Sequence, residues 1–386
     1  MEALWLLFAL IAVFGVVVLP LLRRRRERQE FERAASAAEE RTGPGGRTPD
    51  GVSLGKPGRP GQEGGRPAGG LVPVDQLDVR LPGPDPDLVA ALEETRRTQD
   101  WRPAGRLLAL TDDAEPRWQR VQSLAGAAAM ELAHWRAADQ AGQSGARDAG
   151  WLRRWRTDEP NDAGGAQVYA QFLVWQAMAD PGAAEYRIIL EEARTVCGEA
   201  ARLAPADPIP YITELFIARG LSYRRSDFDA LWEKITQRDD RHMGAHLAAL
   251  PYLSEKWHGS RAEADAFATA AAAGAPEGSL LAALPLFAVY DHLPDVQLSP
   301  GMYQGAVIRD AIEAAQFAVA TVRAGHPVEP HVRHLLLCFL VRAERYPEAA
   351  EQVRAIDGYV GAIPWVDSDN PAGEYAAYRA MAIAGQ

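Results

Sequence analysis

The chain has 386 residues, 47% of them hydrophobic and 24% charged, and its formal net charge is −11 at pH 7. That composition is ordinary for a globular protein. The charge is unevenly spread: residues 1–85 hold 12 basic and 11 acidic side chains, whereas residues 86–386 hold 29 and 41, a net charge of −12. An acidic domain of this kind disfavours nucleic-acid binding, which requires a basic face, and it is repelled by anionic lipid.

Residues 1–22 predict a transmembrane anchor. The stretch from Ala3 to Leu22 carries no charge, and its twenty residues at about 1.5 Å each span the roughly 30 Å hydrocarbon core of a bilayer. We expect this segment to be retained in the cell membrane rather than cleaved or buried in a core, because positive charge follows it and no A-x-A pattern does. Five arginines come directly after it and would touch the membrane surface: Arg23, Arg24, Arg25, Arg26 and Arg28. Arginines mark the cytoplasmic end of a span, so we expect a single-pass protein with its N-terminus outside and its bulk in the cytoplasm.

Two segments follow that are unlike a folded core. Residues 23–42 are rich in helix formers and predict a basic juxtamembrane helix. Residues 43–85 shift to Gly, Pro, Arg and polar residues, as in GKPGRPGQEGGRPAGG, and cannot bury enough apolar area to offset their ordering entropy. We therefore expect a disordered linker with an end-to-end distance of roughly 35–40 Å. Its basic residues either are solvated or form a stripe that touches lipid.

The pattern of residues 86–386 predicts helices throughout. Ala-rich amphipathic stretches alternate with short Pro, Gly and Asp breaks, and apolar residues recur at three and four positions. The expected helices cover residues 86–99, 103–111, 116–139, 145–156, 163–179, 183–203, 208–221, 226–238, 241–256, 260–273, 278–291, 302–324, 328–343, 346–356 and 371–384. A single bundle core does not grow to this size, so the pattern predicts an all-α fold built as an α-solenoid of antiparallel helix pairs.

A repeat of small residues supports this prediction. The spacing of four, three and five residues occurs twice, in Ala193, Cys197, Ala200 and Pro205 and in Ala264, Ala268, Ala271 and Pro276. The two prolines lie 71 residues apart, close to twice a repeat of about 34 residues. Small residues at these positions let two helices cross closely, and the proline ends the second helix.

On these residues the domain resembles the tetratricopeptide-like helical repeat superfamily in a degenerate form. Glu214 departs from that pattern, because it stands where a packing leucine is usual. The resemblance implies a concave groove in which an extended peptide lies. The segments WRTDEPNDAGG and KWHGSRAEADAFA also resemble an actinobacterial family of membrane-anchored helical proteins, which implies no activity.

The sequence contains no motif that indicates catalysis or a cofactor. No nucleophile-elbow, Walker or dinucleotide-binding pattern occurs, and Ser260 with Glu263 matches a helix capping box. The pairs His242 and His246, and His331 and His334, have spacings that could share a metal but lack the rest of a site, so we expect no metal. Cys197 and Cys338 form no disulfide framework, as is usual in a reducing cytoplasm.

Two aromatic and basic segments are candidate protein-binding regions. The first is the stretch Trp151, Arg154, Trp155 and Arg156, and the second is the pair Trp257 and His258. Guanidinium groups stack on indole rings, and both residue types are common in interface hot spots. The alternative is local: Trp151 and Trp155 cover the core while the arginines pair with nearby acids, and Trp257 fills a turn.

These observations predict a membrane-anchored cytoplasmic helical-repeat protein that mediates protein–protein interaction as a scaffold or adaptor. The partner is an unknown protein, and the acidic domain favours a basic one. An enzyme whose site is assembled only in three dimensions and a purely structural spacer remain alternatives. An open groove would favour the binding protein, whereas a deep pocket lined by acids and histidines would favour the enzyme.

Overall fold

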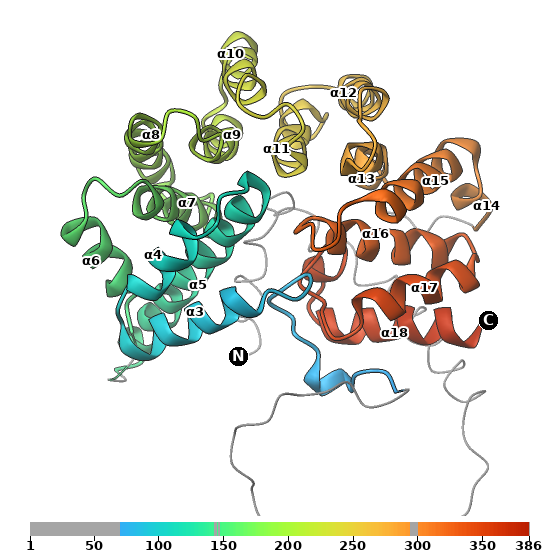
Figure 1. Ribbon diagram of the computed structural model, residues 1–386, viewed down its shortest axis with the longest axis horizontal. Helices are drawn as coiled ribbons and strands as arrows, with labels where there is room; N and C mark the ends of the chain where they lie inside the picture. The colour runs from blue at the N-terminus through green and yellow to red at the C-terminus, as the bar shows by residue number, and fades with distance from the viewer. Residues whose placement is uncertain (1–69, 143–144, 146, 294–299, 386) are drawn as a thin grey trace, which may run out of the picture.

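The computed structural model describes residues 70–142, 145, 147–293 and 300–385, and these residues are helical with no β-strand among them (Figure 1). The expected anchor, juxtamembrane helix and first part of the linker lie outside the described residues. None of the helices in the described part combines the length and the apolar character that a bilayer span requires. The all-α prediction is therefore confirmed for the part of the chain that the structure describes.

The helices follow one another with short connections. Their bounds are α3 Pro86–Thr98, α4 Arg102–Ala109, α5 Ala114–Gln140, α6 Gly150–Asp158, α7 Ala163–Ala179, α8 Tyr186–Leu203, α9 Ile209–Leu221, α10 Arg225–Thr236, α11 Met243–Ala249, η3 Leu250–Leu253, α12 Arg261–Ala273, η4 Leu280–Ala283, α13 Leu284–Asp291, α14 Pro300–Tyr303, α15 Ala306–Thr321, α16 Glu329–Arg342, α17 Tyr346–Ile356, η5 Trp365–Asp367 and α18 Pro371–Ala384, preceded by η2 Val74–Gln76. Helices α7, α17 and α18 have the bounds that the sequence predicted.

Three of the expected helices are each divided in two. The span 241–256 forms α11 and η3, the span 278–291 forms η4 and α13, and the span 302–324 forms α14 and α15. Pro251 and Pro285 stand in the first turn of the second piece, where the missing N–H interrupts the helical hydrogen-bond ladder. Gly305, in an extended conformation, separates α14 from α15.

The helices are arranged along an arc. Figure 1 shows the chain passing from α3 through α7–α10 and α11–α13 to α16–α18, so that α3 and α18 lie on the same side of the molecule. Neighbours in sequence pack on one another, as α7 does on α8, α8 on α9, and α16 on α17. The long helix α5 contacts both α7 and α11 and thereby connects helices that are distant in sequence.

Small residues lie where helices cross. On α8, Ala193, Cys197 and Ala200 are buried where this helix packs against α7 and α9. On α12, Ala264 and Ala268 are buried, and α12 packs against η4 and α13. Ala271 is only half-buried at the edge of the core. The expected packing role therefore holds for five of these six small residues and is weaker at the sixth.

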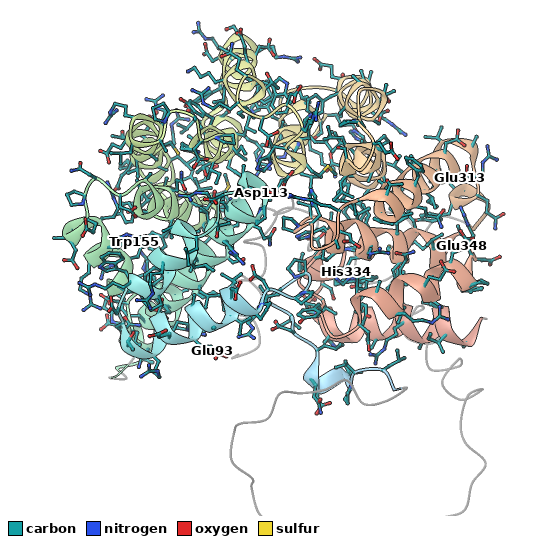
Figure 2. All side chains as sticks on the ribbon, in the orientation of Figure 1. Glu93, Asp113, Trp155, Glu313, His334 and Glu348 are labelled. Atoms are coloured by element: carbon teal, nitrogen blue, oxygen red, sulfur yellow. The ribbon has the colours of Figure 1, made fainter. Side chains whose placement is uncertain are left out.

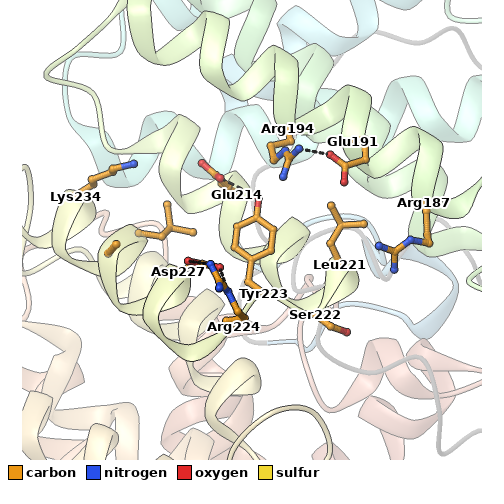
Figure 3. Close-up of a pocket in the computed structure, with 12 residues that line it drawn as sticks. Arg187, Glu191, Arg194, Glu214, Leu221, Ser222, Tyr223, Arg224, Asp227 and Lys234 are labelled. Atoms are coloured by element: carbon orange, nitrogen blue, oxygen red, sulfur yellow. Dashed lines mark hydrogen bonds and ion pairs between the residues drawn. The ribbon is translucent and has the colours of Figure 1, made fainter.

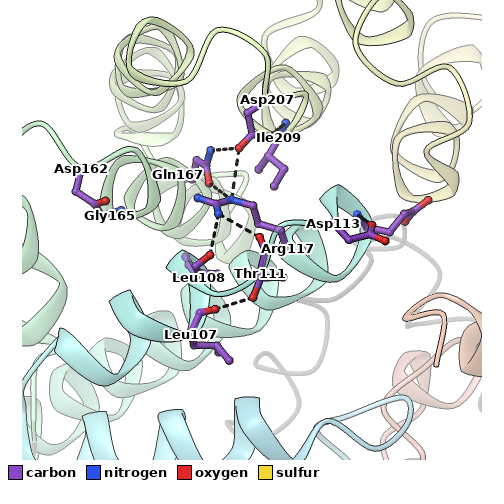
Figure 4. A network of polar contacts seen from close by, with 11 residues as sticks. Leu107, Leu108, Thr111, Asp113, Arg117, Asp162, Gly165, Gln167, Asp207 and Ile209 are labelled. Carbon is purple, nitrogen blue, oxygen red and sulfur yellow. Dashed lines mark hydrogen bonds and ion pairs between the residues drawn. The ribbon is translucent and has the colours of Figure 1, made fainter.

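A polar network joins the region between α4 and α5 to α7 and to the turn before α9 (Figure 4). The guanidinium of Arg117 on α5 donates to the backbone oxygen of Leu108 at 2.8 Å and forms an ion pair with Asp207 at 3.4 Å. Gln167 on α7 donates to the same aspartate at 2.7 Å. Because these groups satisfy one another, polar side chains can lie between helices without leaving buried charges unpaired.

Residues 70–85 form a segment that we call the N-terminal strap. The sequence assigned them to the disordered linker, and that assignment is wrong for this part. Leu77 and Leu81 are buried, and the backbone of Asp78 exchanges two 2.8 Å hydrogen bonds with Gly358 and Val360. The signal was present in the alternating apolar residues of LVPVDQLDVRL, but the Gly and Pro content around them masked it.

The strap ties the two ends of the arc together. Near its start, Asp357 accepts a hydrogen bond from the N–H of Val72 at 2.6 Å, and Arg379 on α18 donates to the oxygen of Val72 at 2.7 Å. At its end, Asp85 caps α3 and forms an ion pair with Arg120 on α5 at 2.9 Å. The strap therefore joins the first helices to the last ones, as Figure 1 shows.

Candidate functional site

The two tryptophans of the first candidate region are core residues. Trp151 and Trp155 on α6 are 1% and 0% exposed, and Figure 2 places Trp155 among the N-terminal helices. The Trp155 ring stacks on Trp101 with 5.3 Å between centroids, and Trp151 donates its indole N–H to Glu131 at 3.3 Å. Buried rings offer no surface to a partner, so this structure removes both residues from the candidate binding surface.

The arginines of that region have local partners. Arg154 is exposed and donates to the backbone oxygen of Gln99. Arg156 is half-buried and forms an ion pair with Glu199 on α8 at 2.9 Å. These contacts match the alternative in which the stretch packs against its own neighbours.

The second candidate region lies in the turn before α12 and contacts α9 and α13. Trp257 is 37% exposed, and the guanidinium of the buried Arg219 lies 4.8 Å from the centre of its ring. The Nε2 atom of His258 lies 3.1 Å from the backbone oxygen of Arg219, and Lys256 forms an ion pair with Asp291 at 3.2 Å. Burial lowers the pKa of Arg219 to about 10, which leaves it charged at neutral pH. The junction thus connects this turn with α9 and α13, and Trp257 remains partly exposed.

The histidine pairs have structural partners. His242 begins α11 and accepts the N–H of Ala245 on its Nδ1 atom at 3.0 Å, and Nδ1 of His246 lies 3.0 Å from the oxygen of His242. His334 is hydrogen-bonded through both ring nitrogens, and burial lowers the pKa of His331. Among the described residues no three His, Cys, Asp or Glu side chains are placed to hold a metal ion.

The structure reveals a site that sequence reasoning did not assemble. A groove of about 500 Å³ opens to solvent between α8, α9 and α10 (Figure 3). It is lined by Arg187, Glu191, Arg194, Glu214, Leu221, Ser222, Tyr223, Arg224, Asp227, Ala230, Leu231 and Lys234. We call it the α8–α10 groove. The sequence pattern singles out only one of its charged residues, Glu214, as the exception to the packing pattern.

The turn between α9 and α10 shapes the groove. Ser222 adopts a left-handed conformation with φ of 57° and ends α9, and the N–H of Tyr223 then donates back to the oxygen of Ala218 at 2.9 Å. This pair of features is the helix-ending arrangement known as the Schellman motif. Because the turn is so short, α10 begins at Arg225 and lies directly beside α9.

A carboxylic acid and a phenol pair within the groove. The hydroxyl of Tyr223 donates to Oε1 of Glu214 at 3.1 Å. Burial raises the pKa of the Glu214 carboxyl, and the hydrogen bond from Tyr223 and the charges of Lys234 and Arg194 oppose that rise. Burial also raises the pKa of Tyr223. Glu214 and Tyr223 therefore give the interior of the groove hydrogen-bonding groups, at a position where the repeat pattern would have a packing leucine.

Some charges around the groove are already neutralised and others are not. Arg194 pairs with Glu191 at 2.6 Å, and Arg224 makes two bonds to Asp227 at 3.0 and 3.2 Å. Arg187 on α8 and Lys234 on α10 form no ion pair within the part of the chain that the structure describes. These two cations are therefore the charges that a ligand would meet.

Comparison with known proteins adds no assignment. No family model, no curated protein and no solved structure matches this chain. The fold and the site define an all-helical protein with an open, polar groove between successive helices.

Proposed function

We propose that this chain is a tetratricopeptide-like helical-repeat protein, an α-solenoid, whose folded domain binds another protein as a scaffold or adaptor. The observation that carries the proposal is the α8–α10 groove, which is open and lies between successive helices. Binding proteins of stacked helices present their partners with extended surfaces of this kind. The packing of helices that follow one another in sequence and the small residues at the helix crossings support such a stack.

We further propose that the domain is held at the inner face of the cell membrane. The support is the uncharged stretch Ala3 to Leu22 and the five arginines that follow it. A reporter that is active only in the cytoplasm, fused after Gln386, should be active. Activity from a reporter that works only outside the cytoplasm would reverse the proposed orientation.

The net charge of −12 over residues 86–386 favours a partner that presents Lys or Arg to most of the domain surface. The test is cross-linking of the full chain in its native membrane, followed by capture and identification of partners by mass. We expect a defined protein whose recovery falls as salt rises, because exposed charges are screened beyond about 8–10 Å. Recovery no higher than that of an unrelated single-span protein would favour the structural-spacer alternative.

A further inference from the structure

We propose that the α8–α10 groove binds an extended acidic peptide segment of the partner protein. This inference rests on the proposed function, because it assigns the binding role of the domain to one place. At the groove the favoured partner segment is acidic, whereas the domain as a whole favours a basic partner.

The sign of the net charge changes locally at the groove. Four cations line the groove against three acids: Arg187, Arg194, Arg224 and Lys234 against Glu191, Glu214 and Asp227. The surrounding domain holds 29 basic and 41 acidic side chains. An acidic segment is therefore repelled by most of the domain and attracted here, which gives specificity for this site.

The two cations without ion pairs are well separated across the groove. Arg187 lies on α8 and Lys234 on α10, and Figure 3 shows them on opposite sides of the groove with Leu221 and Tyr223 between them. A single small anion meets one of them, whereas a chain with two separated carboxylates meets both. This arrangement selects an extended segment with acids on either side of a less polar centre.

Glu214 can accept a hydrogen bond from a ligand in the groove. Its Oε1 atom accepts from Tyr223, which leaves Oε2 to accept a further hydrogen bond. An extended peptide supplies backbone N–H donors along its length. Because the carboxyl is largely buried, satisfying it with a peptide N–H is worth more than the same bond in water.

The groove also has an apolar part. Leu221 lines it between the two cations without ion pairs, as Figure 3 shows. An apolar side chain in the segment can cover it and supply affinity that salt does not screen. The full occupant is thus an acidic segment with one apolar residue near a carboxylate.

The test is a selection of random eight-residue peptides displayed on phage against the full chain in lipid nanodiscs. Enriched peptides should carry Asp or Glu on both sides of an apolar residue, and the synthetic peptides should bind more weakly as NaCl rises. The double variant Arg187→Glu/Lys234→Glu should bind them about tenfold or more weakly, since each reversal replaces an attraction by a repulsion. Enrichment of basic or uncharged peptides, or of none, overturns the proposal.

The matched control is Arg97→Glu/Arg106→Glu, which makes the same change in net charge on α3 and α4, outside the groove. Equal weakening by both double variants overturns the assignment to the groove, because total charge would then explain it. If the charge reversal disturbs folding, the milder variants Arg187→Gln and Lys234→Gln take its place. Each must melt like the parent and should still bind the peptides more weakly. A groove variant that still captures the same membrane partner as the parent refutes this inference alone, whereas a parent that captures none refutes the proposed function.

Discussion

Trp365 donates its indole N–H to Nδ1 of His334 across 2.9 Å among the C-terminal helices. Because Nδ1 accepts this bond, the proton of the neutral ring resides on Nε2, which lies 3.0 Å from the backbone oxygen of Pro82 and donates to it. One buried imidazole therefore connects η5, α16 and the N-terminal strap. Figure 2 places His334 on the side of the C-terminal helices that faces the strap.

The first prediction concerns acid stability. Burial lowers the pKa of His334 to about 4, from about 6.5 in an unfolded chain, so the unfolded state binds more protons between these values. The contribution of the neutral ring is complete above about pH 6.5 and is lost as the pH falls toward 4, by about 3 kcal/mol at most. Urea unfolding of the full chain over this range should show stability falling with pH.

The variant His334→Phe isolates this residue. It should be less stable than the parent at pH 7.5, because Trp365 and Pro82 lose their partner, and its stability should change less steeply between pH 6.5 and 4. Part of the slope will remain, since the pKa values of His326 and His331 are also lowered by burial. A slope identical to that of the parent would show that His334 does not titrate as the structure implies.

The second prediction concerns the ion pair that holds the strap. Asp357 and Arg379 lie 2.9 Å apart with side chains 7% and 10% exposed, and Asp357 also accepts from Val72. Asp357→Ala should cost about 3–5 kcal/mol, because it leaves a buried guanidinium without its counter-ion. The control Asp227→Ala removes an exposed pair with Arg224 and should cost at most about 1 kcal/mol. Similar losses in urea unfolding would contradict the burial of the strap contact.

The third prediction separates the two tryptophan regions. Trp155→Ala should cost about 3–5 kcal/mol, because it leaves a large cavity beside Trp101. Trp257→Ala should cost about 1–2 kcal/mol, since the ring is partly exposed and loses chiefly its contact with Arg219. Thermal melting measures both, and partner capture is assayed in parallel. Loss of capture in Trp257→Ala with little change in melting would add that junction to the binding surface.

The fourth prediction concerns helix crossings. Ala200 has no exposed surface, so Ala200→Leu should overpack the contact between α8 and its neighbours and cost about 1–3 kcal/mol. Ala271 is half-buried, and Ala271→Leu should cost less, because its side chain can turn toward solvent. Melting temperatures of the two variants give the comparison. An equal or larger loss for Ala271→Leu would mean that α12 packs more closely than the structure has it.

Local patterns were enough to predict most of the helices. Proline, glycine and aspartate mark the ends of segments such as α7 and α17, and the apolar period of three and four is continuous between them. The expected cap at Ser260 is present, with its hydroxyl accepting the N–H of Glu263 at 3.2 Å. These features depend on neighbours within a few residues, which is why sequence alone specifies them.

Features that depend on distant residues could not be predicted in the same way. The strap is ordered by contacts between Asp78 and the backbone near Gly358, about 280 residues later in the chain. The groove brings together side chains from Arg187 to Lys234 that share no local motif. From the sequence, Trp151 and Trp155 could lie either on the surface or in the core. A pattern of residue types does not say which helix will cover an aromatic ring.

The strap also imposes an order of events during synthesis. It is translated before every helix that it contacts, yet Asp357, Gly358 and Arg379 emerge from the ribosome only after almost the whole domain has been made. Until then the hydrogen bonds of Val72 and Asp78 to these residues cannot form. Docking of this part of the strap is therefore a late step, which follows the synthesis of the helices between α3 and α18.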